Sequence, residues 1–148
     1  MRQTIIKLPS PQLKGKVSLE ETILKRRAVR RHRRDPLNLF QLSQILWSGQ
    51  GTTRTGGYRA APSAGGIYHI DIFAFVSKQA VIASEVKQAP EELPAGIYNY
   101  EADSHSQSLH KSADLRSDLA RATLAQEFII EAPVDIVICA LYHRTSYR

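Results

Sequence analysis

The feature that most constrains the fold is an apolar run at residues 67–76, whose side chains alternate between two faces of unequal polarity. One face is wholly apolar and consists of Tyr68, Ile70, Ile72, Ala74 and Val76. The opposite face mixes polar and apolar residues, namely Ile67, His69, Asp71, Phe73 and Phe75. This alternation predicts a strand that is buried fully on one side and half buried on the other.

Further segments extend the strand pattern. The β-branched run at residues 133–141 predicts a second long strand, and residues 96–100 predict a short aromatic one. Residues 108–110 are expected to pair with the aromatic strand as a hairpin, across a turn at residues 103–104. Residues 77–95 remain ambiguous between a strand end, a short helix and a loop.

Three helices are predicted from caps and apolar spacing, of which the second and third are described first. Asn38 and Gln41 are placed as a capping box that opens a helix ending before Gly49. Trp47 closes the apolar stripe of this helix, and we expect it in the core. Apolar residues at helical spacing predict another helix over residues 114–127.

The first predicted helix, at residues 18–30, leads into the chain's main concentration of charge. Ser18 and Glu21 match a capping box, and apolar residues at helical spacing predict a buried face. Residues 25–34, here called the basic segment, hold seven of the chain's twenty Lys and Arg residues and no acid. The remaining thirteen basic residues face fourteen acidic ones, so the pI near 9.7 derives from this segment.

Two interpretations of the basic segment are open at this point. It is either a solvated arm that meets phosphates without specificity, or the end of a packed helix whose arginines converge on one small phosphorylated ligand. The cap and the apolar stripe favour the packed helix. Nucleic-acid binding is a weaker alternative, because no aromatic side chain other than His32 interrupts the basic residues.

Residues 49–66 form a second candidate site. They have no hydrophobic period, but they hold six glycines, three threonines and the isolated Arg54 and Arg59. A loop of this length inside a compact domain is usually functional. His69 and Asp71 follow on one strand face, but no third ligand of suitable spacing accompanies them, so no metal site is predicted.

Length and composition limit the class of protein. A chain of 148 residues with 43% hydrophobic and 23% charged residues suits one globular domain, here 18–148, after an extended lead-in at 1–17. No apolar stretch reaches the length of a membrane span, and the single Cys139 excludes an internal disulfide. We therefore expect a cytoplasmic protein without membrane association, with Cys139 buried in its strand.

Taken together, the motifs resemble the nitroreductase superfamily of flavoproteins, and within it the SagB-type dehydrogenases. The matching pieces occur in the family's order over nearly the whole chain. They are residues 18–23, 26–31, 42–47, 58–68, 96–100 and 131–134. The resemblance implies an α+β fold in which a mixed sheet is flanked by helices on both faces.

The resemblance also implies an FMN-dependent oxidoreductase that works as a homodimer with the flavin between subunits. Hydride would pass through the flavin to or from a small molecule or a peptide azoline. In the family, arginines at the end of the first helix contact the flavin's phosphate and ribityl region, and a Pro-Ser-Ala-Gly segment lies beside its isoalloxazine ring. The residues so implied are Arg26, Arg27, Ala28, Arg30, Pro62, Ser63, Ala64 and Gly65. The flavin itself carries the hydride chemistry, so no catalytic side chain is assigned.

The chain departs from the family pattern in three respects. Ala28 stands where the family usually has Ser, so one hydroxyl contact to FMN is absent, and His32 replaces an aromatic residue. Family domains are also longer, so we expect this chain to be the N-terminal portion of such a domain. It ends where Arg148 takes the place of a lysine considered catalytic in the azoline dehydrogenases. The alternative is a non-catalytic remnant or interaction module that retains no flavin.

Overall fold

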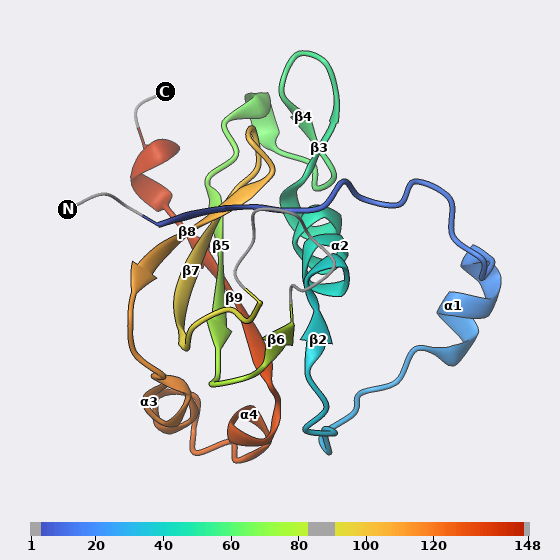
Figure 1. Cartoon of the computed structure of the whole chain (residues 1–148). Helices are drawn as coiled ribbons and strands as arrows, with labels where there is room; N and C mark the ends of the chain where they lie inside the picture. Colours follow the sequence, from blue (N-terminus) through green and yellow to red (C-terminus); the bar gives the residue numbers. More distant parts are fainter. Residues whose placement is uncertain (1–3, 83–90, 147–148) are drawn as a thin grey trace.

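The computed structural model describes residues 4–82 and 91–146, which form an α+β fold (Figure 1). The strands are β1 (Ile5–Lys7), β2 (Leu37–Asn38), β3 (Thr52–Arg54), β4 (Tyr58–Arg59), β5 (Ile70–Val76), β6 (Val81–Ile82), β7 (Gly96–Glu101), β8 (Ser106–Lys111) and β9 (Val134–Ala140). The helices are α1 (Leu19–Lys25), α2 (Leu39–Gln50), α3 (Arg116–Ala122) and α4 (Phe128–Glu131), with 3-10 turns η1 (Ala64–Gly66) and η2 (Tyr142–Arg144). The predicted α+β class is confirmed.

A five-stranded sheet forms the centre of the molecule. Its strand order is β1-β8-β7-β5-β9, and every neighbouring pair is antiparallel. In the described part of the chain, parallel pairing is confined to β2 and β6, and β3 pairs with β4 as a small antiparallel ribbon. The edge strand β1 comes from residues that the sequence indicated only as an extended lead-in. Of the described residues, no helix has the length and apolar character needed to span a membrane. The predicted cytoplasmic location stays a prediction.

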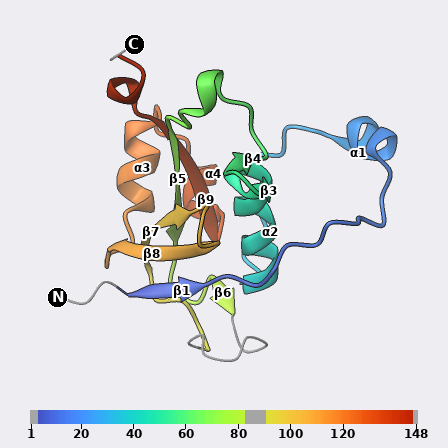
Figure 2. The ribbon, with the colours of Figure 1, turned by 90° about the horizontal axis from the view of Figure 1, so that it is seen from above.

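The strand β5 confirms the alternation of faces seen in the sequence. Ile72, Ala74 and Val76 are buried, whereas the residues between them are half-buried. The strand begins at Ile70, later than predicted, because Tyr68 has a φ of 48°, which is incompatible with extended backbone. In Figure 2, α2 and α3 lie on opposite sides of β5, so both faces of the sheet carry a helix, as expected.

The helix α2 supplies much of the core on one side of the sheet. Its predicted capping box is confirmed, because Asn38 Oδ1 accepts from Gln41 N at 2.7 Å and Gln41 Oε1 accepts from Asn38 N at 2.9 Å. The leucines of its stripe are fully buried and pack with the β5 face described above. Trp47 is half-buried instead of lying in the core, and its indole N–H donates to Thr52 O at 3.2 Å.

The predicted hairpin and the second long strand are also confirmed, as β7, β8 and β9. Cys139 in β9 is half-buried, which is less than the burial that the sequence predicted. The single helix predicted at 114–127 was also wrong, because the chain forms α3 and α4 with Leu124 and Ala125 at positive φ between them. Arg116 donates to the carbonyls of two residues at the end of α4, which holds the two helices together. Of the ambiguous segment, residues 83–90 lie outside the described part.

Candidate functional site

The basic segment follows α1, and the structure shortens this helix relative to the prediction. Ser18 Oγ accepts from Glu21 N at 3.1 Å, so the predicted N-cap is present, and Lys25 pairs with Glu21 one turn away. The helix ends at Lys25, since Arg26 has a ψ of 125°. The prediction of a helix to residue 30 was therefore wrong.

The predicted buried face of α1 is also wrong within a single chain. Leu19, Ile23 and Leu24 are 65–74% exposed, and both views show α1 standing away from the sheet (Figures 1 and 2). Short helices gain most of their stability from packing of an apolar face. Because nothing in the described residues covers this face, the helix has no packing that would extend it into the basic segment.

The predicted phosphate contacts are exposed and available to an anion. Arg26, Arg27 and Arg30 form no ion pair within residues 4–82 and 91–146. Among the described residues, Arg27 donates only to backbone carbonyls of α1 and its cap, at 3.3 and 3.5 Å. Ala28 lies between these arginines and is exposed. Guanidinium groups without carboxylate partners keep their donors free for phosphate oxygens.

Beyond these arginines, the basic segment borders a hollow of about 480 Å³ beside β9. His32 lies 6.1 Å from the ring of Phe128, and Arg33 pairs with Asp35. Asp135 of β9 also lines this hollow, and burial raises the pKa of its carboxyl group to about 6. The hollow therefore combines basic side chains with one carboxyl group that is easily protonated.

The other candidate segment folds as a turn just before the start of β5. Ser63 is extended, and Ala64 and Gly65 begin η1, where Gly65 has a φ of 64° that favours glycine. Ser63 Oγ accepts from Tyr68 N at 2.8 Å, which closes the turn. The hydroxyl of Ser63 is thus committed to the protein, whereas Pro62, Ala64 and Gly65 are exposed.

Sequence reasoning noted Arg59 but missed its position beside this turn. Its backbone N donates to the hydroxyl of Tyr68 at 3.0 Å, and its guanidinium lies 4.7 Å from the centroid of the Tyr68 ring. Its Nη2 also lies 3.5 Å from Asp103 Oδ1. The sequence shows Arg59 nine residues before Tyr68, which precedes the predicted strand core. This spacing alone does not show that the two side chains are in contact.

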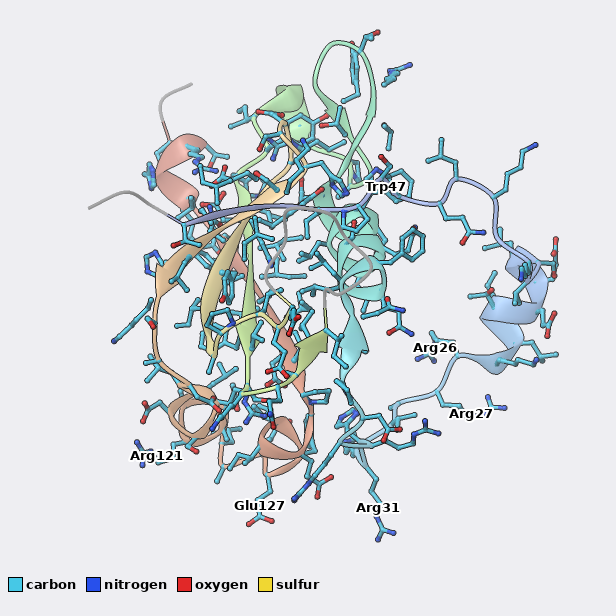
Figure 3. The ribbon with its side chains drawn as sticks, in the orientation of Figure 1. Arg26, Arg27, Arg31, Trp47, Arg121 and Glu127 are labelled. Atoms are coloured by element: carbon cyan, nitrogen blue, oxygen red, sulfur yellow. The ribbon has the colours of Figure 1, made fainter. Side chains whose placement is uncertain are left out.

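The structure does not bring the two predicted halves of the site together within one chain. Figure 3 shows Arg26 and Arg27 on the side of α1, whereas η1 lies at the upper end of the sheet in Figure 1. Asp71, which shares a strand face with His69, pairs with Arg144 at 2.8 Å. The described residues contain no group of three potential metal-ligating side chains. The predicted position of the lysine, Arg148, lies outside the described residues.

Comparison with known proteins identifies relatives of this arrangement. The family model described as Nitroreductase family matches residues 23–148. The predicted nitroreductase MJ1384 of Methanocaldococcus jannaschii is 35% identical over 130 residues, which cover 88% of this chain and 60% of that protein. The chain therefore spans somewhat over half the length of this relative.

Solved structures agree with this comparison. A predicted nitroreductase from Ralstonia eutropha JMP134 superposes with a TM-score of 0.76 and 34% identity, over 96% of this chain and 58% of that one. The E. coli microcin synthetase McbBCD complex gives a TM-score of 0.53 at 18% identity, over 95% of this chain and 54% of that chain, which shows the fold alone. The fold of the present chain is thus nitroreductase-like.

Proposed function

The chain belongs to the nitroreductase family, and from this premise we propose that it contributes to an FMN-dependent oxidoreductase. Bound FMN would supply hydride transfer, and the protein would supply binding, orientation and electrostatics. The observation that carries the proposal is a set of exposed arginines at the motif position, for which the described residues supply no acidic partner. They are Arg26, Arg27 and Arg30.

The chemistry of these arginines fits the phosphate of FMN. A phosphate dianion is strongly hydrated, and several guanidinium groups are needed to replace its water with charge-assisted hydrogen bonds. We propose that Arg26, Arg27 and Arg30 hold the phosphate and the ribityl chain. Ala28 would lie between them without a hydroxyl contact of its own, which leaves the arginines to hold the phosphate.

The turn at η1 fits the isoalloxazine ring. Pro62, Ala64 and Gly65 are exposed and small, so a flat ring can approach the backbone closely. The backbone N–H of Tyr68 donates a hydrogen bond to Ser63 Oγ, and this contact closes the turn. A rigid turn fixes the direction from which the backbone meets the ring, and hydrogen bonds from backbone amides tune flavin electronics.

The separation of the two halves supports a site built between two subunits. In one chain the arginines and η1 lie apart, so a single flavin that contacts both is more easily held where two copies meet. The exposed Leu19, Ile23 and Leu24 of α1 provide an apolar surface for such a contact. We propose a homodimer with the flavin at its interface.

The substrate proposal is either a small electron-poor molecule or an azoline ring in a peptide. The motifs that resemble SagB-type dehydrogenases favour the azoline. The McbBCD complex was solved with truncated pro-MccB17 bound, but its 18% identity relates it to this chain by fold alone. No side chain of the described residues is proposed as a proton donor or acceptor for the reaction.

The experiment that tests the proposal is an absorption spectrum of the purified protein between about 350 and 500 nm, with FMN added if the protein is colourless. The mass in solution is measured on the same sample. Arg27→Ala and Arg30→Ala are each expected to weaken FMN binding by about tenfold or more, since each removes a charge-assisted hydrogen bond.

The matched control is Arg121→Ala, because Arg121 is an exposed arginine on α3 that lies far from α1 in Figure 3. This variant is expected to bind FMN as the wild type does. An equal loss in all three variants would mean that the arginines act only through net charge. A protein that takes up no FMN at any accessible concentration would be a remnant without oxidoreductase function.

A further inference from the structure

A polar cavity opens where the sheet splits between β5 and β7. Backbone pairing of these strands runs from Val76 with Gly96 to Phe73 with Asn99 and continues no further. Past that point, a cavity of about 330 Å³ separates the first residues of β5 from the last of β7. Its remaining walls come from Gln50 of α2, Arg59 of β4, Arg144 of η2 and the turn at residues 102–103 after β7.

Three side-chain atoms in these walls are buried and have no hydrogen-bond partner among the described residues. They are Gln50 Oε1, Arg59 Nε and Asn99 Oδ1. Gln50 is only 4% exposed, so it cannot turn outward to meet bulk water. Buried polar atoms in folded proteins are nearly always paired. Three unpaired atoms around one cavity therefore indicate that a polar guest completes their hydrogen bonds.

The orientation of the Asn99 amide is fixed by its neighbour. Asn99 Nδ2 donates to Glu101 Oε1 at 2.7 Å, and a carboxylate accepts but does not donate. The amide oxygen of Asn99 is therefore the unpaired acceptor. Together with Gln50 Oε1 it requires a guest that donates hydrogen bonds, whereas Arg59 Nε requires one that accepts.

The charged side chains that line the cavity indicate the charge of the group on the ligand that donates hydrogen bonds. Arg144 pairs with Asp71 at 2.8 Å, and Arg59 Nη2 lies 3.5 Å from Asp103 Oδ1. Glu101 is the remaining carboxylate and has no basic partner among the described residues. The lining thus carries one excess negative charge, which favours a cationic donor such as an ammonium group.

We propose that this cavity binds a small zwitterion of the α-amino-acid class. The ammonium group would donate to the oxygens of Gln50 and Asn99 beside Glu101, and the carboxylate of the guest would accept from Arg59 Nε. Such a ligand supplies donors and an acceptor in one small molecule, which matches the unpaired atoms. Water alone is the competing occupant.

None of the proposed flavin contacts lines this cavity, but hydrogen bonds connect one of its lining residues, Arg59, to the turn that holds Ser63. The backbone N of Arg59 donates to the hydroxyl of Tyr68, and Tyr68 N donates to Ser63 Oγ. A ligand that binds Arg59 therefore contacts a residue that is linked through Tyr68 to Ser63 in the Pro62–Gly65 turn. The binding proposal itself stands on the cavity and does not depend on flavin.

The experiment is a titration of the flavin-free protein with L-alanine, followed by calorimetry. Ethylammonium and propionate, which each carry one half of the zwitterion, are the comparison probes. We expect saturable binding of alanine, tighter than either half. Gln50→Leu and Asn99→Leu are each expected to weaken alanine binding by about tenfold or more, because each removes an acceptor from the ammonium group.

The matched control is Gln107→Leu. Gln107 is also a fully buried amide with unpaired side-chain atoms, but it does not line this cavity. The Gln107→Leu variant is expected to bind alanine as the wild type does, provided circular dichroism shows that the variant is folded. Should Gln50→Leu fail to fold, the half-buried Asn99 still supplies a variant at the site.

Two results would overturn the proposal: no saturable binding of alanine at accessible concentrations, or affinity unchanged in both cavity variants. The cavity would then hold water alone. Since no flavin is present in the titration, either result leaves the flavin proposal untouched. Conversely, binding of alanine without binding of FMN would support the cavity proposal and refute the proposed oxidoreductase function.

Discussion

Replacing Asp135 by asparagine is expected to stabilise the protein at neutral pH. Asp135 lies in β9 opposite Phe75, and its Oδ2 is buried without a partner among the described residues. Burial raises the pKa of this carboxyl from 3.8 to about 6, although the nearby Arg116 and His32 lower it in part. Asparagine has the same shape but carries no charge to desolvate.

The size of the effect follows from the pKa. At about 1.4 kcal/mol per pKa unit, a rise from 3.8 to about 6 corresponds to about 3 kcal/mol of destabilisation by the ionised form. Asp135 is only half-buried, so solvent screening reduces this figure, and we expect a gain of about 1–2 kcal/mol from the substitution. For a domain of this size that is a rise in Tm of about 3–6 °C.

The gain should depend on pH in a defined direction. Above pH 6 the carboxyl is ionised in both the folded and the unfolded chain, and its charge penalises the folded state. As the pH falls through about 6, the folded state takes up the proton before the unfolded state does, and the wild type recovers stability. The advantage of Asp135→Asn is therefore present at pH 7.5 and lost by about pH 4.

Urea unfolding at several pH values measures this difference. Asp118→Asn is the matched control, because Asp118 is exposed on α3 and its surface pair with Arg121 contributes little. The reasoning is refuted if Asp135→Asn destabilises the protein at pH 7.5. It is refuted equally if the difference from the wild type persists unchanged at pH 4.

Two further predictions concern His105, in the turn between β7 and β8, and Gly51, which follows α2. His105→Ala should destabilise the fold by about 1–3 kcal/mol in urea unfolding, because Tyr100 OH at 2.9 Å loses its hydrogen-bond partner. Pro9 O loses one of two donors and keeps the hydroxyl of Ser43. A loss below about 0.5 kcal/mol would contradict this. Gly51→Ala should cost about 1–3 kcal/mol and alter the fluorescence of Trp47, since a new Cβ would lie 2.7 Å from Trp47 O and against its indole ring. Unchanged fluorescence and stability would show that this approach is not tight.

Several elements were predictable because the information that forms them is local. The alternation at 67–76 identified β5, and the Asn38–Gln41 capping box identified α2, since each depends on residues that are close in sequence. The run at 133–141 likewise identified β9. The candidate site segments were also found locally, from the charge of the basic segment and the glycines of the following loop.

Elements that depend on distant contacts could not be predicted in the same way. The end of α1 at Lys25 reflects an apolar face without a packing partner in the described chain, and no local pattern reports that absence. The break between α3 and α4 accompanies contacts of Arg116 with residues fourteen and sixteen positions away. The strand β1 exists because β8 pairs with it.

By itself, the sequence determined where side chains of a given chemistry lie along the chain: three arginines, which we propose for the phosphate of a flavin, and a small-residue turn, which we propose for its ring. Only the tertiary structure decided that these residues lie apart in one chain. It also decided that Gln50, Arg59 and Asn99, distant in sequence, line one cavity. The physical reason is that residue type sets what a side chain can bind, whereas strand order and the end of strand pairing set which side chains meet.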